Sequence, residues 1–272
     1  MNQNLFKYAL HLADNSLIMG QRNAEWTGHG PVLEQDIAIT NISLDLIGQA
    51  RNFYQYAADV FNQMSESEKQ DVEYLLPRLW KTFERKLEED DLAYLRDENQ
   101  FLNLQLVELP KGDWAYSILK QFFFSAFQFY QFKALEQSGD SQMAAIAEKS
   151  LKETAYHLRW SGEWVIRLGD GTGESRYRIQ NALSELWMFT GEMFQASDFE
   201  SSLKEKNISV DPSTLKTQWD QKIKDVFSEA GLEIPVSQWN QSGGKQGIHT
   251  EYMGFLLAEM QVLQRSYPNA TW

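Results

Sequence analysis

Apolar residues recur through most of this chain at the three- and four-residue spacing that places them on one face of an α-helix. Four long helices are predicted, over residues 5–22, 33–64, 114–137 and 141–168. Further helices are predicted over 92–109, 174–195, 211–230 and 248–265, and a weaker helical pattern covers 198–210. The chain has only 6 Pro and lacks strand-like runs of Val, Ile and Thr. The pattern therefore predicts an all-α bundle of long antiparallel helices with additional shorter helices.

The segment 37–51, IAITNISLDLIGQAR, is apolar on almost every side of its predicted helix. A helix that is apolar nearly all round is expected to be buried nearly all round. We therefore predict that this segment is the central helix of the bundle. Asp45 lies in its middle. Because an isolated ionised carboxylate is costly to bury, Asp45 must meet a cation, hydrogen-bond donors or a metal.

Local signals mark several helix boundaries. Ser65 and Glu68 have the spacing of a capping box that opens a third helix, and Pro77 is expected to kink or restart it. Residues 80–87 alternate charged and aromatic side chains, which predicts a partly solvated helix. Asp113 is predicted to cap the helix of 114–137. That helix carries seven aromatic residues between positions 122 and 132, so it is either a core helix or one packed against a partner.

Composition narrows the class of protein. The chain has 272 residues, 43% of them hydrophobic, and a formal net charge of −13. So acidic a chain disfavours nucleic acid as a partner. It has no cysteine, which excludes disulfides, zinc-thiolate sites and a cysteine nucleophile. No signal peptide or membrane-spanning run is predicted. We expect one domain over residues 1–272 and a cytoplasmic protein.

Inward carboxylates in a long-helix bundle suggest a test for a di-iron site. Such a site needs a carboxylate from each of two helices and a Glu-x-x-His pair from each of two others. His157 has Glu153 four residues before it, but three residues before it is Thr154. Three residues after Asp45 is Gly48, not histidine, and residues 114–135 hold no acid. The ligand set therefore falls short of a di-iron site.

The acids and the histidine still need partners, and two interpretations stay open. They are buried polar groups satisfied by Arg22, Arg51, Arg159 or one another, or they are ligands of an atypical metal site. The residues concerned form a hypothetical vestigial site: Asp14, Asp45, Glu153 and His157. The segment 247–251, GIHTE, is expected to cap a helix start through Thr250 or His249.

Several segments together resemble a known family. They are DNSL at 14–17, QRNAEWTGHGP at 21–31, NISLDLIGQAR at 41–51, RDE at 96–98, VELPKGD at 107–113, KETAYHLR at 152–159, GGKQGIHTE at 243–251 and LAEMQ at 257–261. In this order they resemble the C subunits of the bacterial ring 1,2-phenylacetyl-CoA epoxidases. The resemblance covers nearly the whole chain, with the weakest match over residues 62–86.

The resemblance implies a ferritin-like fold and a structural role. In that family the catalytic di-iron site belongs to a paralogous A subunit, with which the C subunit pairs. A small B subunit and an NADPH-dependent reductase complete the complex, which epoxidises the ring of phenylacetyl-CoA in aerobic phenylacetate degradation. No catalytic residue, cofactor or metal ligand is carried over to this chain. It is expected to self-associate when alone and to present an apolar surface, on the Phe-rich helix or the long second helix, that its partner covers.

Two rival functions stay open. One is a self-sufficient di-iron or manganese oxygenase with ligands drawn from the four residues of the vestigial site. The other is an acyl-CoA-binding helical module, which would need a cluster of cations for the CoA phosphates. The one close group of cations is Lys81, Arg85 and Lys86.

Overall fold

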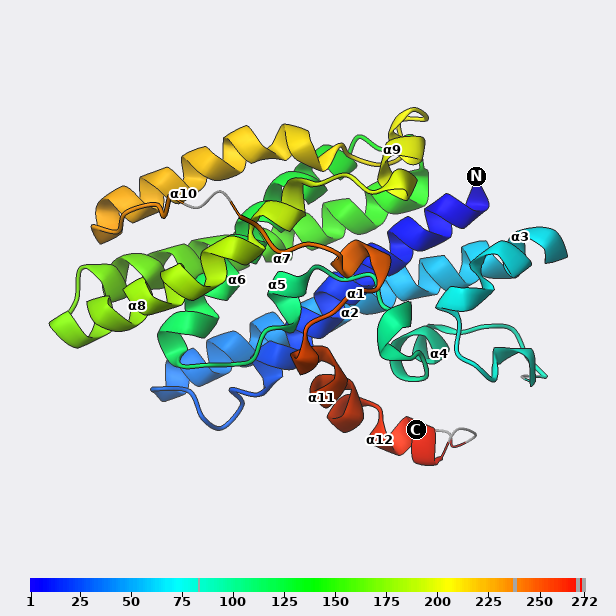
Figure 1. Ribbon diagram of the computed structural model, residues 1–272, viewed down its shortest axis with the longest axis horizontal. Coiled ribbons are helices and arrows are strands. Elements are labelled where there is room, and N and C mark those ends of the chain that lie inside the picture. The colour runs from blue at the N-terminus through cyan, green and yellow to red at the C-terminus, as the bar shows by residue number, and fades with distance from the viewer. Residues whose placement is uncertain (83, 237–238, 268–269, 271–272) are drawn as a thin grey trace.

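The computed structural model describes residues 1–82, 84–236, 239–267 and 270. Over these residues it contains helices and connecting segments but no strand (Figure 1). The prediction of an all-α fold is therefore confirmed, and the arrangement is that expected of a ferritin-like bundle.

Four long helices form the centre of the molecule. They are α1 (Asn2–Ala24), α2 (Leu33–Asn62), α6 (Trp114–Leu135) and α7 (Ser141–Gly169). Helix α1 packs along α2, and α6 packs along α7, each pair joined by a short connection that reverses the chain. Contacts between α2 and α7, and hydrogen bonds between α1 and α6, join the two pairs (Figure 1). The four-helix arrangement follows from four amphipathic helices that bury their apolar faces together.

Shorter helices cover the bundle. They are α3 (Glu66–Val72), α4 (Glu89–Tyr94), α5 (Gln105–Glu108), α8 (Gly173–Leu186), α9 (Asp198–Lys204), α10 (Lys216–Ala230), α11 (Glu251–Met260) and α12 (Val262–Ser266). Single 3₁₀ turns are η1 (Glu73–Leu75), η2 (Trp80–Thr82), η3 (Glu98–Gln100), η4 (Trp187–Phe189), η5 (Gly191–Phe194), η6 (Pro212–Leu215) and η7 (Gly244–Gln246). Helices α8 and α10 pack on α6 and α7, whereas α4 packs on α2 (Figure 1).

Two of the predicted caps are present. Asp113 accepts a hydrogen bond from the backbone N–H of Tyr116 at 2.9 Å, which begins α6. Ser65 and Glu68 form the capping box that begins α3. These side chains satisfy backbone N–H groups that have no partner inside the first helical turn.

Several predicted helices are wrong in their extent. Residues 92–109 form the end of α4, η3, an extended segment and α5, not one helix. Helix α8 ends at Leu186, before two 3₁₀ turns, and residues 248–250 are not helical. The predicted helix 80–87 is a single 3₁₀ turn, with residue 83 outside the described residues. In these regions tertiary contacts of the backbone override the local helical pattern.

The Phe-rich helix α6 belongs to the core. Five of its aromatic side chains, Phe122, Phe123, Phe124, Phe127 and Phe132, are buried within the chain. Helix α2, by contrast, is buried on one side only, which contradicts the predicted burial nearly all round. Ile37 is 52% exposed and Leu44 is 62% exposed, whereas Ile42 and Leu46 are fully buried. The apolar outer face of α2 is exposed because no element of the described chain covers it.

A helix that crosses a bilayer must be both long and apolar. Among the helices of the described residues, none combines the length and the apolar character needed to cross a bilayer.

Candidate functional site

A histidine–carboxylate pair joins α2 to α7. His157 Nε2 lies 3.0 Å from Asp45 Oδ2. The His157 side chain is fully buried, whereas that of Asp45 is 36% exposed. His157 Nδ1 is buried without a hydrogen-bond partner among the described residues. The pair therefore lies at the outer edge of the α2–α7 contact and uses only one of the two imidazole nitrogens.

A second pair lies one helical turn along the same two helices. Gln49 Nε2 donates a hydrogen bond to Glu153 Oε2 at 2.9 Å. Gln49 is four residues after Asp45, and Glu153 is four residues before His157. Because residues four apart share a helix face, the two pairs form successive polar contacts between antiparallel α2 and α7.

The interior between α1 and α6 is lined by hydroxyl and amide groups. Asn23 Nδ2 donates to Gln121 Oε1 at 2.6 Å, and Gln121 Nε2 donates to Ser125 Oγ at 2.7 Å. Gln128 Nε2 donates to Ser16 Oγ at 3.3 Å. Such neutral groups are poor ligands for iron in comparison with carboxylate and imidazole.

Asp14 lies in a separate buried cluster, apart from the α2–α7 pairs. Its carboxylate pairs with the guanidinium of Arg96, and Tyr54 Oη donates to it at 2.5 Å. The backbone N–H of Leu102 also donates to it, at 2.7 Å. Burial raises the pKa of Tyr54 well above its usual value, and the charge of Asp14 adds to this effect. The Tyr54 hydroxyl is therefore a fixed donor.

The cation that pairs with Asp14 is not one of those expected from the sequence. Arg96 lies 82 residues away in the chain, and its guanidinium carbon is 4.1 Å from the centre of the Phe101 ring. Arg22 instead donates to Glu25 and to backbone carbonyls, while Arg51 pairs with Glu89. No spacing signal in the sequence points to Arg96, because the contact depends on the path of the chain after α4.

The donor set does not fit a di-iron centre. Of the four residues in the vestigial-site hypothesis, the structure brings together Asp45 and His157 and places Glu153 one turn away beside Gln49. In the part of the chain that the structure describes, no three His, Cys, Asp or Glu residues are grouped so as to hold a metal ion. A di-iron site needs about six such ligands around two ions.

Two of the three cations considered for CoA phosphates are already engaged. Arg85 Nη1 and Nη2 donate to the two carboxylate oxygens of Asp91 at 2.7 and 2.8 Å. Lys81 Nζ lies 2.5 Å from Glu73 Oε1. Because carboxylates offset both charges, this cluster offers little attraction to phosphate groups.

Buried carboxylates fix the segment before α11 on the bundle. Glu192 Oε1 accepts the backbone N–H groups of Gly243 and Gly244 at 2.8 and 2.7 Å, and its Oε2 accepts that of Gln105 at 2.8 Å. Gly243 has φ +121°, and a Cβ on Gly244 would lie 2.1 Å from the backbone oxygen of Asn103. Both positions therefore require glycine.

A buried ion pair and a histidine contact complete this attachment. Lys245 Nζ lies 2.8 Å from Glu200 Oε2, and both side chains are buried. His249 Nδ1 lies 2.7 Å from Glu108 Oε2, and its Nε2 is 3.0 Å from the backbone oxygen of Phe101. The motif at 243–251 thus has an internal structural role. Its histidine bonds to the carboxylate of Glu108, and neither the Thr250 nor the His249 side chain caps α11.

This contact predicts a pH dependence. Burial alone would lower the pKa of His249, but the hydrogen bond and charge of Glu108 outweigh it, so the pKa is raised. The stability from protonated His249 is therefore fully present below about pH 6.5 and is lost as the pH rises through the raised folded-state pKa. We expect His249→Gln to lower the free energy of unfolding by about 1–3 kcal/mol at pH 6, and by less at higher pH.

Urea denaturation of the unmodified chain and the variant, over a pH series from mildly acidic to mildly alkaline, measures this difference. His29→Gln is the matched control because His29 is exposed. A loss for His249→Gln that is constant across the series would show that His249 does not carry the charge.

Comparison with known proteins shows the family to which the chain belongs. Residues 1–272 match the model of the phenylacetic acid catabolic protein family, and the chain belongs to that family. It is 44% identical over 272 residues, the whole of both chains, to the C subunit of the 1,2-phenylacetyl-CoA epoxidase of Escherichia coli (strain K12). The family resemblance identified from the sequence is thereby confirmed.

Proposed function

We propose that this chain is the non-catalytic structural subunit of a phenylacetyl-CoA epoxidase. The observation that supports it most strongly is the set of polar groups between the long helices. Hydroxyl and amide groups bond to one another between α1 and α6, and the carboxylates of Asp45 and Glu153 are engaged by His157 and Gln49. Such a bundle keeps the fold of a di-iron protein without its ligands. The proposed role of this chain is therefore to bind a partner subunit that has the di-iron ligands.

The proposed partner is the di-iron catalytic subunit of the same complex. A small B subunit and an NADPH-dependent reductase are the further members of the assembly, which would act in the cytoplasm on phenylacetyl-CoA. We also propose that residues 1–272 form one domain, and that the chain self-associates when its partner is absent. The relative's name, which makes it one of the subunits of an epoxidase, supports membership of a complex.

The outer face of α2 is the proposed docking surface for the catalytic subunit. Leu33, Ile37 and Leu44 are 72%, 52% and 62% exposed, and their spacing of four and seven residues places them on one side of the helix. A Cβ on Gly48, the next position along that side, would meet no atom within 4 Å. Several large apolar side chains exposed on one side of a helix, here interrupted only by Asn41, indicate a protein interface. The Phe-rich helix, whose rings are largely buried, is no longer a candidate.

Reconstitution tests the proposed function. The catalytic subunit, the small B subunit and the reductase are assayed for phenylacetyl-CoA epoxidation with and without this chain. We expect turnover to require the chain, while the iron content of the catalytic subunit stays the same without it. Turnover at the full rate without the chain would contradict the structural role.

A further inference from the structure

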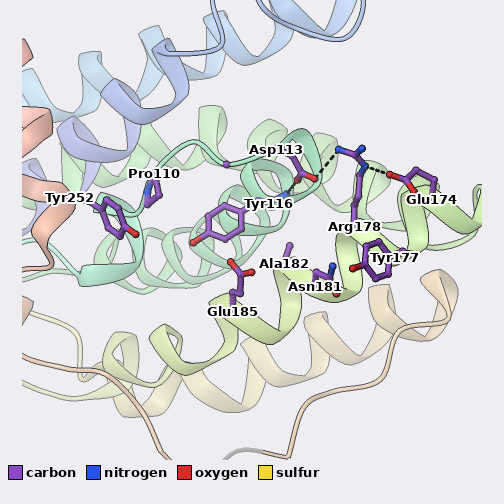
Figure 2. Close-up of a pocket in the computed structure, with 11 residues that line it drawn as sticks. Pro110, Asp113, Tyr116, Glu174, Tyr177, Arg178, Asn181, Ala182, Glu185 and Tyr252 are labelled. Carbon is purple, nitrogen blue, oxygen red and sulfur yellow. Dashed lines mark hydrogen bonds and ion pairs between the residues drawn. The ribbon is translucent and has the colours of Figure 1, made fainter.

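A groove of about 480 Å³ lies on the side of the molecule formed by the start of α6, one face of α8 and the first turn of α11. Figure 2 shows it as an elongated hollow with Pro110 and Tyr252 at one end and Tyr177 and Arg178 at the other. Its volume is within the range of sites that bind ligands or side chains. None of the residues of the α2–α7 pairs lines it.

The groove carries an excess of negative charge. Arg178 Nε donates to Glu174 Oε1 at 2.7 Å, and its Nη1 lies 3.3 Å from Asp113 Oδ2, so two carboxylates offset this one cation. Glu185 extends into the middle of the groove (Figure 2). Across the described residues, the Glu185 carboxylate has neither a hydrogen bond nor an ion pair. The Glu185 side chain is exposed, so water rather than a cation of the described residues solvates this carboxylate, which leaves it open to a ligand.

Tyrosine side chains line the rest of the groove. Tyr116, Tyr177 and Tyr252 come from α6, α8 and α11 respectively, and the Tyr116 hydroxyl points toward the side of Glu185 (Figure 2). Burial raises the pKa of Tyr116, and the negative charge of Glu185 contributes, so its hydroxyl stays protonated. Aromatic rings beside a carboxylate attract guanidinium and ammonium groups, because the ring faces and the carboxylate charge act together.

The groove is preformed on the α6 side. Gly112 has φ +61°, and a Cβ at this position would lie 2.8 Å from the Tyr116 ring. The turn therefore packs its bare backbone against the ring and blocks motion of the ring toward Gly112. A side chain held in this way costs less conformational entropy when a ligand binds.

Exposed apolar residues are close in sequence to Tyr252, which lies at one end of the groove. Tyr252 is four residues after Ile248 and three before Phe255, and these neighbours are 62% and 70% exposed. The spacing places Tyr252 and Phe255 on one side of α11. A small free cation would leave this surface uncovered, whereas a protein segment that extends past Tyr252 would bury it.

We propose that this groove binds a lysine or arginine side chain, presented by an apolar segment of a partner protein. The cationic group lies against Glu185 and the rings of Tyr116 and Tyr252, and the apolar residues of that segment cover Phe255 and Ile248. The identity of the partner, another member of the epoxidase complex, rests on the proposed function. The chemistry of the groove does not, because it follows from the Glu185 carboxylate and the rings of Tyr116 and Tyr252.

The first experiment tests the chemistry on the full chain labelled with 3-fluorotyrosine. Fluorine NMR follows a titration with N-acetyl-arginine amide, and the Tyr116→Phe and Tyr252→Phe variants assign the signals. We expect saturable shifts at both tyrosines and an affinity about tenfold lower in Glu185→Gln, because a charge-assisted hydrogen bond is lost. Glu229→Gln, at an exposed glutamate on α10, is the matched control. An unsaturable response, or equal affinity in Glu185→Gln, would overturn the proposal.

The second experiment distinguishes a protein from a free organic cation. Affinity is measured between Glu185→Lys and each purified partner of the complex. We expect one partner to bind about tenfold more weakly or worse, since charge reversal replaces attraction with repulsion, and we expect N-acetyl-arginine amide to compete with it. Unchanged affinity for all partners would assign the groove to a small molecule and overturn the protein occupant. Leu44→Glu, on the separate α2 face, reports on the proposed function independently.

Discussion

Replacing Arg96 with alanine is expected to lower the free energy of unfolding by about 3–5 kcal/mol. Arg96 and Asp14 are both fully buried, and Arg96 also donates to the backbone oxygens of Leu92 and Gln100. The variant would leave the Asp14 carboxylate inside the protein with only Tyr54 and the Leu102 N–H as donors. Reversible urea denaturation followed by circular dichroism measures the loss.

A surface control and a double variant test whether the loss of stability comes from the buried, unpaired charge. Arg78→Ala removes an exposed arginine that pairs with Asp97, and it should cost no more than about 1 kcal/mol. The double variant Asp14→Leu with Arg96→Met removes both buried charges and should recover much of the lost stability, since an apolar replacement of a buried ion pair is often neutral. A loss of less than about 1 kcal/mol for Arg96→Ala would contradict the view that this pair is a buried structural contact.

Leu44→Glu is expected to weaken binding to the catalytic subunit by about a hundredfold or more. Burial of a leucine side chain contributes about 1.5–3 kcal/mol, a buried unpaired carboxylate costs further free energy, and each step of about 1.4 kcal/mol changes affinity about tenfold. Because Leu44 is largely exposed in the isolated chain, the free energy of unfolding should change by no more than about 0.5 kcal/mol. Analytical ultracentrifugation or calorimetric titration of the two purified proteins gives the affinity.

Leu79→Glu is the matched control for this prediction. Leu79 is 64% exposed but lies between η1 and η2, away from α2 in the sequence. It should bind the catalytic subunit like the unmodified chain. Normal binding by Leu44→Glu would show that the outer face of α2 is not the docking surface.

The long helices could be predicted closely because their signals are local. The predicted boundaries 114–137 and 141–168 compare with Trp114–Leu135 and Ser141–Gly169, and the cap of α6 at Asp113 was evident from the sequence. Apolar spacing over many helical turns is a strong pattern. The region 92–109 could not be predicted in this way. Its backbone pairs with Glu192, 87 residues later in the chain, and no local pattern contains that contact.

Part of the candidate site could likewise be predicted from the sequence, and part could not. Asp45, Glu153 and His157 could be selected because each is a polar residue within an apolar helical pattern, and the structure brings Asp45 and His157 into contact. The partner of Asp14 could not be selected, because it depends on how the segment after α4 folds back. The sequence also could not show which apolar side chains of α2 are exposed. An apolar outer face on α2 has the same pattern whether another helix of this chain or a separate protein covers it.

The central claim, that this chain is a structural subunit without its own metal centre, is tested most directly by its iron content. The purified chain is incubated anaerobically with ferrous iron, desalted and analysed for metal. We expect a content close to zero, because the buried hydroxyl and amide groups and the occupied carboxylates offer no di-iron ligand set. About two iron ions per chain, as a di-iron site requires, would contradict the claim and would identify Asp45, Glu153 and His157 as the first ligands to replace.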